Sequence, residues 1–185
     1  ERLGVVSQVQ YRIKVIFERH IDDVRARRSF SGRLATDEDL WSWDRALHFL
    51  DTHPPDLIDL NDNKKRFYLK NSHHRHSQPL WAKGIVREMI EAFPQNTITN
   101  IVFLGIGKDS QSYPRHADKM DVFLVQGIAD VELRVEGYRN ESTFTLKPKD
   151  FIWIPRGIHH EIIPSTSRVT FSFGVEGQPN PTTYV

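Results

Sequence analysis

The chain has 185 residues, enough for one domain with a sizeable core and too few for two comfortable ones, and its 25 Lys and Arg against 24 Asp and Glu leave a formal net charge of +1. This balance argues against a dedicated nucleic-acid surface or a polybasic membrane anchor, and the absence of cysteine excludes disulfides, thiolate zinc sites and a cysteine nucleophile. The sequence shows neither a signal-like segment nor an apolar run of about 18 residues, so we expect a soluble, cytoplasmic protein with no membrane or nucleic-acid partner.

The N-terminal part begins with a segment, 5–17, in which apolar and polar residues alternate. This alternation favours a half-buried strand, although an amphipathic helix stays open because no Gly or Pro interrupts the run that follows. Thr36 then precedes three acidic residues, a helix-start signal that predicts a helix near 37–51. We expect Trp41 and Trp43 to pack in the core or on a dimer face, so a homodimer stays open as an oligomeric state.

Residues 56–96 predict two short strands and a second helix. Short apolar runs at 57–60 and 67–69 are separated by a turn-like polar stretch. The helix is expected near 80–93 and should pack, like the first, outside a β-barrel. Its apolar face is made of Ile85, Met89, Ile90 and Phe93.

Three histidines, His73, His74 and His76, lie within four residues and raise the question of a metal site. They sit in a polar loop with no carboxylate or cysteine nearby to complete a ligand set. We therefore interpret this loop as one that borders a pocket, ahead of an ordered metal site.

From residue 97 onward the sequence has the character of a β-protein. Seven short runs rich in β-branched and aromatic residues are separated by turns, and this spacing predicts a sandwich or barrel. The runs are 98–104, 122–125, 131–135, 143–146, 151–154, 161–163 and 169–175. We therefore expect a mixed α/β part, 1–96, packed on a barrel core with a C-terminal tail, 97–185, in one structural domain.

Two candidate metal ligands lie two residues apart in an extended segment. If the backbone there is a strand, His116 and Asp118 point the same way, so an imidazole and a carboxylate reach one point in space. A histidine that returns after further strands would complete a set of two histidines and one carboxylate, which is typical of non-haem Fe(II) oxygenases. Both His159 and His160 qualify, because the turn at 155–157 resets the alternation.

Motif residues surround these histidines on both sides. They are an apolar strand led by Asn100 and ending in Gly105, Pro114 two residues before His116, the later Phe123 and Gln126, and the runs Pro148-x-Asp150 and Ile154-Pro155-Arg156-Gly157-x-x-His160. In these residues the sequence resembles the JmjC-like cupin group of Fe(II)/2-oxoglutarate-dependent hydroxylases. The resemblance covers roughly 97–175, under half of the chain.

The resemblance implies a mainly β fold, a double-stranded β-helix (cupin barrel) with a helical N-terminal part. It selects His160 as the third ligand beside His116 and Asp118, and it implies Fe(II) with 2-oxoglutarate and O2 as co-substrates. The implied reaction couples oxidative decarboxylation of 2-oxoglutarate to succinate with hydroxylation of an unactivated C–H bond. The implied substrate is an amino-acid side chain, free or within a peptide or protein.

One departure from the family pattern concerns the far carboxylate of 2-oxoglutarate. The lysine that usually holds it is missing, because Ala129 stands at the aligned position. A carboxylate buried without a cation is strongly disfavoured. We expect Arg168 to take this role, since a guanidinium pairs bidentately with a carboxylate and other oxygenases of this barrel type place an arginine on the equivalent strand.

Further residues are expected around the co-substrate. Ser172 shares a strand face with Arg168 and Thr170, and Tyr113 stands where relatives carry a hydroxyl that reaches the same carboxylate. Weaker candidates for the pocket are Asn100 and Lys119, and alternative cations are Arg115, Lys119 and Arg134.

Two other functions stay open. One is a metal-dependent cupin enzyme that does not use 2-oxoglutarate, such as an isomerase or a dioxygenase that binds its substrate directly, and the missing lysine favours it. The other is a non-catalytic barrel that binds or dimerises, with the histidines as ordinary core residues. The substrate pocket would be built from the N-terminal half, where no motif names a substrate.

Overall fold

Two antiparallel sheets form the body of the protein. The computed structural model describes residues 16–35, 41–61, 65–70 and 78–177. The larger sheet has the strand order β1-β9-β6-β11-β4-β3-β2 and the smaller one β5-β10-β7-β8. The strands of the larger sheet are β1 (Phe30–Arg33), β2 (Ile58–Asn61), β3 (Arg66–Lys70), β4 (Thr97–Gly105), β6 (Asp121–Ile128), β9 (Asp150–Ile154) and β11 (Arg168–Glu176). Those of the smaller sheet are β5 (His116–Ala117), β7 (Val131–Val135), β8 (Phe144–Leu146) and β10 (His159–Ile163).

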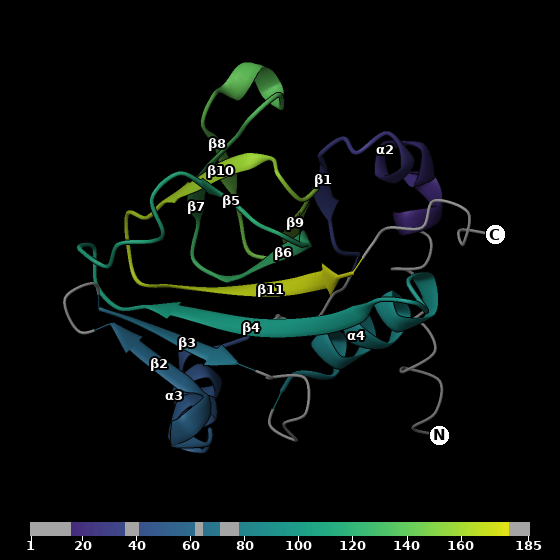
Figure 1. Ribbon diagram of the computed structural model, residues 1–185. Helices are drawn as coiled ribbons and strands as arrows, with labels where there is room; N and C mark the ends of the chain where they lie inside the picture. The colour runs from purple at the N-terminus through teal and green to yellow at the C-terminus, as the bar shows by residue number, and fades with distance from the viewer. Residues whose placement is uncertain (1–15, 36–40, 62–64, 71–77, 178–185) are drawn as a thin grey trace.

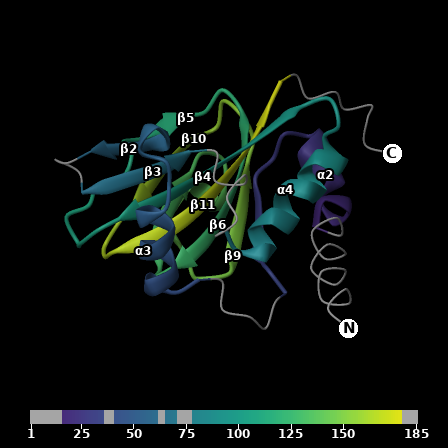
Figure 2. The same cartoon turned by 90° about the horizontal axis from the view of Figure 1, so that it is seen from below.

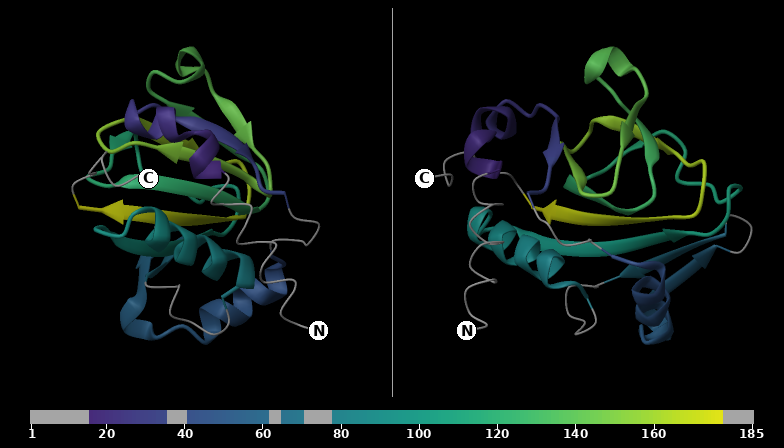
Figure 3. Two further views of the ribbon diagram at one scale, coloured as in Figure 1. Left: turned by 90° about the vertical axis from the view of Figure 1, so that its right-hand side faces the viewer. Right: turned by 180° about the vertical axis from the view of Figure 1, so that it is seen from behind.

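The sheets lie one above the other, and helices cover the outer face of the larger sheet. In Figure 1 the smaller sheet lies above β11 and β4, whereas α3 (Trp43–Asp51) and α4 (Leu80–Ala92) lie below them. Seen from below in Figure 2, both helices cross the face of the larger sheet, and the two views of Figure 3 show the same layers from other sides. A short helix, α2 (Ile21–Arg25), lies beside β1, and single 3-10 turns occur at Pro55–Leu57 and Arg139–Glu141. None of the helices in the described ranges is long and apolar enough to cross a membrane.

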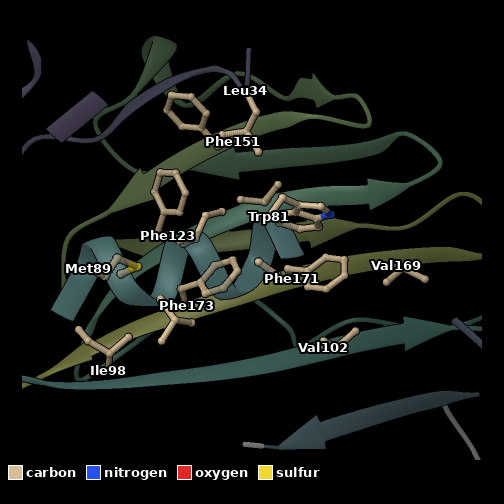
Figure 4. Packing of buried hydrophobic residues seen from close by; sticks show 14 of the residues in the cluster. Leu34, Trp81, Met89, Ile98, Val102, Phe123, Phe151, Val169, Phe171 and Phe173 are labelled. Atoms are coloured by element: carbon tan, nitrogen blue, oxygen red, sulfur yellow. The ribbon is translucent and has the colours of Figure 1, made fainter. Parts of the chain in front are cut away.

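Side-chain alternation along the strands separates two apolar cores. In the core between the larger sheet and the helices, Phe171 and Phe173 of β11 are fully buried beside Trp81 and Met89 of α4 (Figure 4). The ring centroids of Trp81 and Phe171 lie 4.6 Å apart. The core between the sheets is made of Val122, Leu124, Val131, Leu133, Val135, Phe144, Leu146, Ile152 and Ile154. The second face of β11 is therefore free to line the interior of the barrel.

The observed strands confirm the expected fold class, a mainly β double-stranded β-helix with helices outside it. Each of the seven runs predicted from residue 97 onward forms a strand, and the two short strands predicted before it are β2 and β3. The β2–β3 pair joins the larger sheet through antiparallel pairing of β3 with β4. Residues before the barrel thus extend its larger sheet.

Two strands were not predicted. β1 pairs with β9, and β5 has only two residues and pairs with β10. Neither has an apolar alternation long enough to be recognised, because tertiary pairing alone defines them. The strand expected over 5–17 is wrong where it can be examined, since residues 16–19 are helical and the Ile16 carbonyl accepts a 3.1 Å hydrogen bond from the His20 N–H. The rest of that segment lies outside the described residues.

Helix α3 begins later than the helix-start signal at Thr36 predicted. Its N-cap is Ser42, whose hydroxyl accepts a hydrogen bond from the Arg45 N–H, so the first helical residue is Trp43. Thr36 and the acidic residues after it lie outside the described ranges, as do the three histidines of 73–76. Trp41 is buried against Phe171, with ring centroids 5.0 Å apart. It therefore packs in the core, which was one of the two positions expected for it.

Helix α4 confirms the predicted helix near 80–93, with one correction to its apolar face. Ile85, Met89 and Phe93 are buried, but Ile90 is 53% exposed. One residue corresponds to about 100° around a helix, so the residue after Met89 turns away from the sheet.

The two neighbours Met89 and Ile90 provide a matched test of this packing. Met89→Ala should lower the free energy of unfolding by about 2–5 kcal/mol, because it opens a cavity in the core. Ile90→Ala should change it by less than about 0.5 kcal/mol, since that side chain is mostly in solvent. Urea unfolding followed by circular dichroism measures both, and equal losses would contradict the placement of α4.

Candidate functional site

Strands β5 and β10 bring the candidate metal ligands together. His116 of β5 lies opposite His160 of β10 in antiparallel register. Asp118 follows β5, and its carbonyl oxygen accepts a 3.0 Å hydrogen bond from the N–H of Gly157 in the turn before β10. Backbone pairing between two distant segments therefore places His116, Asp118 and His160 at one site.

The three side chains direct their donor atoms toward one another. Asp118 Oδ2 lies 3.5 Å from His160 Nε2, and Asp118 Oδ1 lies 3.8 Å from His116 Nε2. One donor atom from each residue lies within 4.8 Å of the others. A single metal ion can therefore bind all three, and two imidazoles with one carboxylate leave coordination positions open for other ligands.

Hydrogen bonds on the far side of each ring orient the two imidazoles. His116 Nδ1 donates to the Pro114 carbonyl oxygen at 2.8 Å, and His160 Nδ1 donates to the Ile158 carbonyl oxygen at 3.2 Å. A carbonyl oxygen only accepts, so each Nδ1 carries the proton and each neutral ring has its lone pair on Nε2. Metal-binding histidines are commonly held this way.

The environment of His160 favours the neutral imidazole that metal binding requires. Burial lowers the pKa of His160, and the neighbouring His116 adds to this, while the Ile158 carbonyl and the Asp118 carboxylate oppose it. The net shift is downward, so His160 stays neutral to lower pH than an exposed histidine does.

His159 lies on the other side of the strand. Its side chain is 53% exposed, and its Nδ1 lies 2.9 Å from Glu136 Oε2. The hydrogen bonds from the backbone N–H and the ring of His159 hold the pKa of the Glu136 carboxyl below its ordinary value. The alternation of the sequence allowed either His159 or His160 to be the third ligand. In the structure, His160 is the one that lies beside His116 and Asp118.

A cavity of about 400 Å³ lies beside the triad, between the two sheets. His116, Asp118 and His160 form part of its wall, and the apolar side chains of Phe103 and Leu124 form another part. This size is in the range of small-molecule sites. A metal held by the triad would therefore have its open coordination positions near a largely apolar cavity.

Arg168 lines this cavity at the start of β11, together with Thr170 and Ser172 on the same strand face. The side chain is buried, and Nη1 donates to Ser110 Oγ at 2.7 Å and to the Ser110 carbonyl oxygen at 3.1 Å. Burial, followed by the nearby Arg66, lowers the pKa of Arg168 to about 10, which leaves it charged at neutral pH.

Ala129 occupies the turn between β6 and β7, where the family lysine would stand. Its backbone is left-handed, with φ of 61°, and its carbonyl oxygen accepts a 2.8 Å hydrogen bond from the side-chain amide of Gln126. The side-chain amide oxygen of Gln126, Oε1, in turn accepts a 2.7 Å hydrogen bond from the Thr170 hydroxyl. Ala129 is not part of the cavity wall, which Arg168 of β11 does line.

Of the other residues expected to contact the co-substrate, one lines the cavity and one does not. Tyr113 lines the cavity with its side chain half in solvent, whereas Asn100 does not line it. Asn100 lies on the face of β4 shared with Val102, toward the helices, where it donates a 3.0 Å hydrogen bond to the Ser172 carbonyl and accepts one from the Gln78 amide. Alternation along β4 explains this difference from the expected position.

The alternative cations lie outside the cavity wall. Lys119 is exposed, and two arginines form ion pairs at the surface. Arg115 pairs with Glu141 at 3.5 Å, and Arg134 pairs with Glu161 at 3.4 Å. Arg168 is thus the one cation among these sequence candidates that reaches the interior.

Sequence reasoning missed the contribution of β3. Arg66, Tyr68 and Lys70 all line the cavity, and burial raises the pKa of the Tyr68 hydroxyl above its usual range. Their spacing of two residues was the available signal, since alternate residues of a strand share a face.

No protein-family model matches the sequence, and no curated protein matches it either. Among solved structures, the chain is similar to YcfD, a ribosomal oxygenase from Escherichia coli, with a TM-score of 0.63 and 15% identity over 87% of this chain and 52% of that chain. A structure of the same protein in complex with cobalt and 2-oxoglutarate gives a TM-score of 0.65 and 16% identity over 89% of this chain and 52% of that chain.

At this level of identity the likeness concerns the fold. It agrees with the double-stranded β-helix seen here. The chain spans about half the length of the YcfD chains.

Metal binding by the adjacent histidines should differ sharply. His160→Ala should weaken Mn(II) or Fe(II) binding by more than about a hundredfold. Loss of a residue that only hydrogen-bonds to a metal ligand commonly costs about ten- to a hundredfold in affinity, and loss of a ligand itself should cost more. His159→Ala should leave affinity nearly unchanged, since its ring pairs with Glu136. Equilibrium dialysis under anaerobic conditions tests this, and loss of the metal in His159→Ala alone would place the ligand one residue earlier.

Proposed function

We propose that this protein is an Fe(II)- and 2-oxoglutarate-dependent oxygenase that hydroxylates an unactivated C–H bond of an amino-acid side chain. The observation that carries the proposal is a pair of features in one cavity, the His116, Asp118 and His160 triad that could hold a metal ion and the buried guanidinium of Arg168. A 2-oxo diacid such as 2-oxoglutarate would bind the metal through its oxo-acid end. Its second carboxylate, at the far end, then needs a buried cation as a partner.

Arg168 is suited to hold that carboxylate. Its hydrogen bonds to the described residues all come from Nη1, which leaves the Nε and Nη2 pair for a ligand. This pair presents two parallel N–H groups, the geometry that binds a carboxylate bidentately. No described carboxylate forms an ion pair with Arg168, so a bound diacid would supply the missing counter-charge.

The residues present fit an Fe(II) site with this chemistry. His116 and His160 offer neutral Nε2 atoms, and Asp118 offers a negative charge that partly neutralises a divalent ion. When bound, Fe(II) with O2 and 2-oxoglutarate would supply the oxidising chemistry, with succinate and CO2 as products of the co-substrate. The apolar wall, including Phe103 and Leu124, would keep bulk water away from the reacting groups.

A side chain within a peptide or protein is the substrate form that we favour. An open groove of about 540 Å³ runs along residues 108–114 and 161–164, and Ser112, Tyr113 and Ile162 belong to the walls of both the groove and the inner cavity. An extended chain in the groove could therefore direct one side chain toward the triad. YcfD, whose fold is similar, is a ribosomal oxygenase, which supports a macromolecular substrate.

The assay of succinate release from 2-oxoglutarate tests the proposal directly. His116→Ala, Asp118→Ala and His160→Ala should each abolish release, and release should need added Fe(II). No succinate from the wild type would instead favour a metal-dependent cupin that does not use 2-oxoglutarate.

Removal of Arg168 should act on co-substrate affinity and hardly on metal binding. An unpaired buried carboxylate costs roughly 2–5 kcal/mol. Arg168→Ala should therefore raise the 2-oxoglutarate concentration needed for half-saturation between about thirty- and several-thousandfold. Arg168→Lys should recover only part of the loss, because an ammonium lacks the forked donors. Tyr113→Phe should weaken 2-oxoglutarate binding by about 1 kcal/mol, the loss of one hydrogen bond. Unchanged half-saturation in Arg168→Ala would assign the carboxylate to another cation.

Gly105 provides a second, indirect test of the same guanidinium. A Cβ added at Gly105 would lie 2.6 Å from Arg168 Nη1 and 2.8 Å from Ser110 Oγ, so Gly105→Ala must displace the end of Arg168. We expect half-saturation by 2-oxoglutarate to rise about five- to tenfold, the loss of roughly one hydrogen bond, with metal affinity unchanged. A variant with wild-type half-saturation would show that the position of this guanidinium is unimportant.

A further inference from the structure

A second buried arginine, Arg66, stands next to Arg168 across three neighbouring strands. Arg66 of β3 pairs in register with Gly105 of β4, and Gly105 pairs in register with Arg168 of β11. Because the middle residue has no side chain, the space above it is open to both guanidinium groups. Arg66 and Arg168 both line the cavity beside the triad.

The contacts of Arg66 leave one of its donors unused. Nη1 donates to the Gln111 carbonyl oxygen at 3.3 Å, and the guanidinium carbon lies 4.9 Å and 4.7 Å from the ring centroids of Tyr68 and Tyr113. Arg66 is only 5% exposed, and its Nε is buried without a hydrogen-bond partner among the described residues. Buried donors of this kind are uncommon and call for a ligand.

The charge of this cavity wall is not compensated within the protein. In the described part of the chain neither Arg66 nor Arg168 forms an ion pair, and Arg66 disfavours the charged form of Arg168. Other cations of the described chain do have carboxylate partners: Arg156 forms a 3.0 Å ion pair with Asp121, and the partly exposed Lys70, on the same face of β3, pairs with Asp59 at 2.5 Å. Two neighbouring buried cations without a carboxylate indicate a site for an anion.

We propose that Arg66 is a second cation for the far carboxylate of the 2-oxo acid, so that an arginine pair selects diacids over monoacids. This inference rests on the proposed function, because it concerns the same co-substrate. A carboxylate between the two guanidinium groups would pair with the guanidinium of Arg66 and with the Nε and Nη2 pair of Arg168. The hydroxyl of Tyr68 is a further donor at the same wall.

A purely structural role for Arg66 makes a different prediction. If it served only to hold the segment of Gln111 and Tyr113 against β3, its loss would disturb the cavity for every 2-oxo acid alike. If Arg66 instead binds the far carboxylate, its loss weakens the binding of only those acids that have a far carboxylate. Two acids that share the metal-binding end and differ at the other end therefore separate the two roles.

The experiment is a calorimetric titration of Mn(II)-loaded protein with 2-oxoglutarate and with 2-oxopentanoate, which has the same length and ends in a methyl group. Arg66→Gln should weaken 2-oxoglutarate binding by about ten- to a hundredfold, the loss of a charged hydrogen bond, and leave 2-oxopentanoate binding the same or slightly stronger. Arg33→Gln is the matched control, since it removes an arginine of the same sheet that does not line the cavity and already pairs with Asp150 at 2.7 Å. It should bind both acids as the wild type does.

Each other outcome decides against the inference. An equal loss for both acids in Arg66→Gln would assign Arg66 a structural role, and no loss for either would place the carboxylate out of its reach. A wild type that fails to bind 2-oxoglutarate would overturn the proposed function as well, which distinguishes the two failures. Should Arg66→Gln not fold, Arg66→Lys serves, with a smaller loss expected for 2-oxoglutarate alone.

Discussion

The central strand β11 is the constraint on which the rest of the structure depends. It pairs with β4 on one side and β6 on the other, so its two faces are fixed by the sheet and cannot rotate independently. One face buries Phe171 and Phe173 against the helices, and that packing requires Arg168 to face the barrel interior. The hydrophobic energy of the outer core therefore supports the burial of a charged group on the opposite face, which would otherwise move to solvent.

The cavity wall shows how stability and binding oppose each other at this site. Arg66 and Arg168 are buried near one another without a described counter-charge, which disfavours the unliganded fold. An anion that binds only the folded state would relieve this repulsion and stabilise the protein in proportion to its concentration. Hydrogen bonds to Ser110 and Gln111 and the two tyrosine rings hold the guanidinium groups in place meanwhile.

The sequence allowed much of the barrel to be predicted, because each run alternates or is apolar over its own length. The same alternation placed Arg168 and Ser172 on one face, yet it could not say which face met the cavity, and so Asn100 was expected in the wrong layer. His160 could be chosen only through the family resemblance, since a turn separates it from the preceding strand. Strands β1 and β5 depend on pairing between distant segments, which no local pattern records, and the pairing of β3 with β4 is what brings Arg66 beside Arg168.

The order of the strands also determines how the protein can be divided. β1 covers the outer side of β9, and β3 with β2 covers the outer side of β4, so both margins of the larger sheet are closed by residues that precede the barrel. A fragment beginning at residue 97 would expose a row of unpaired backbone N–H and C=O groups on each of these strands, and such edges recruit strands from other molecules. The segment that carries the family resemblance is therefore a poor unit for expression by itself, and aggregation of such a fragment would say nothing about the chemistry of its site.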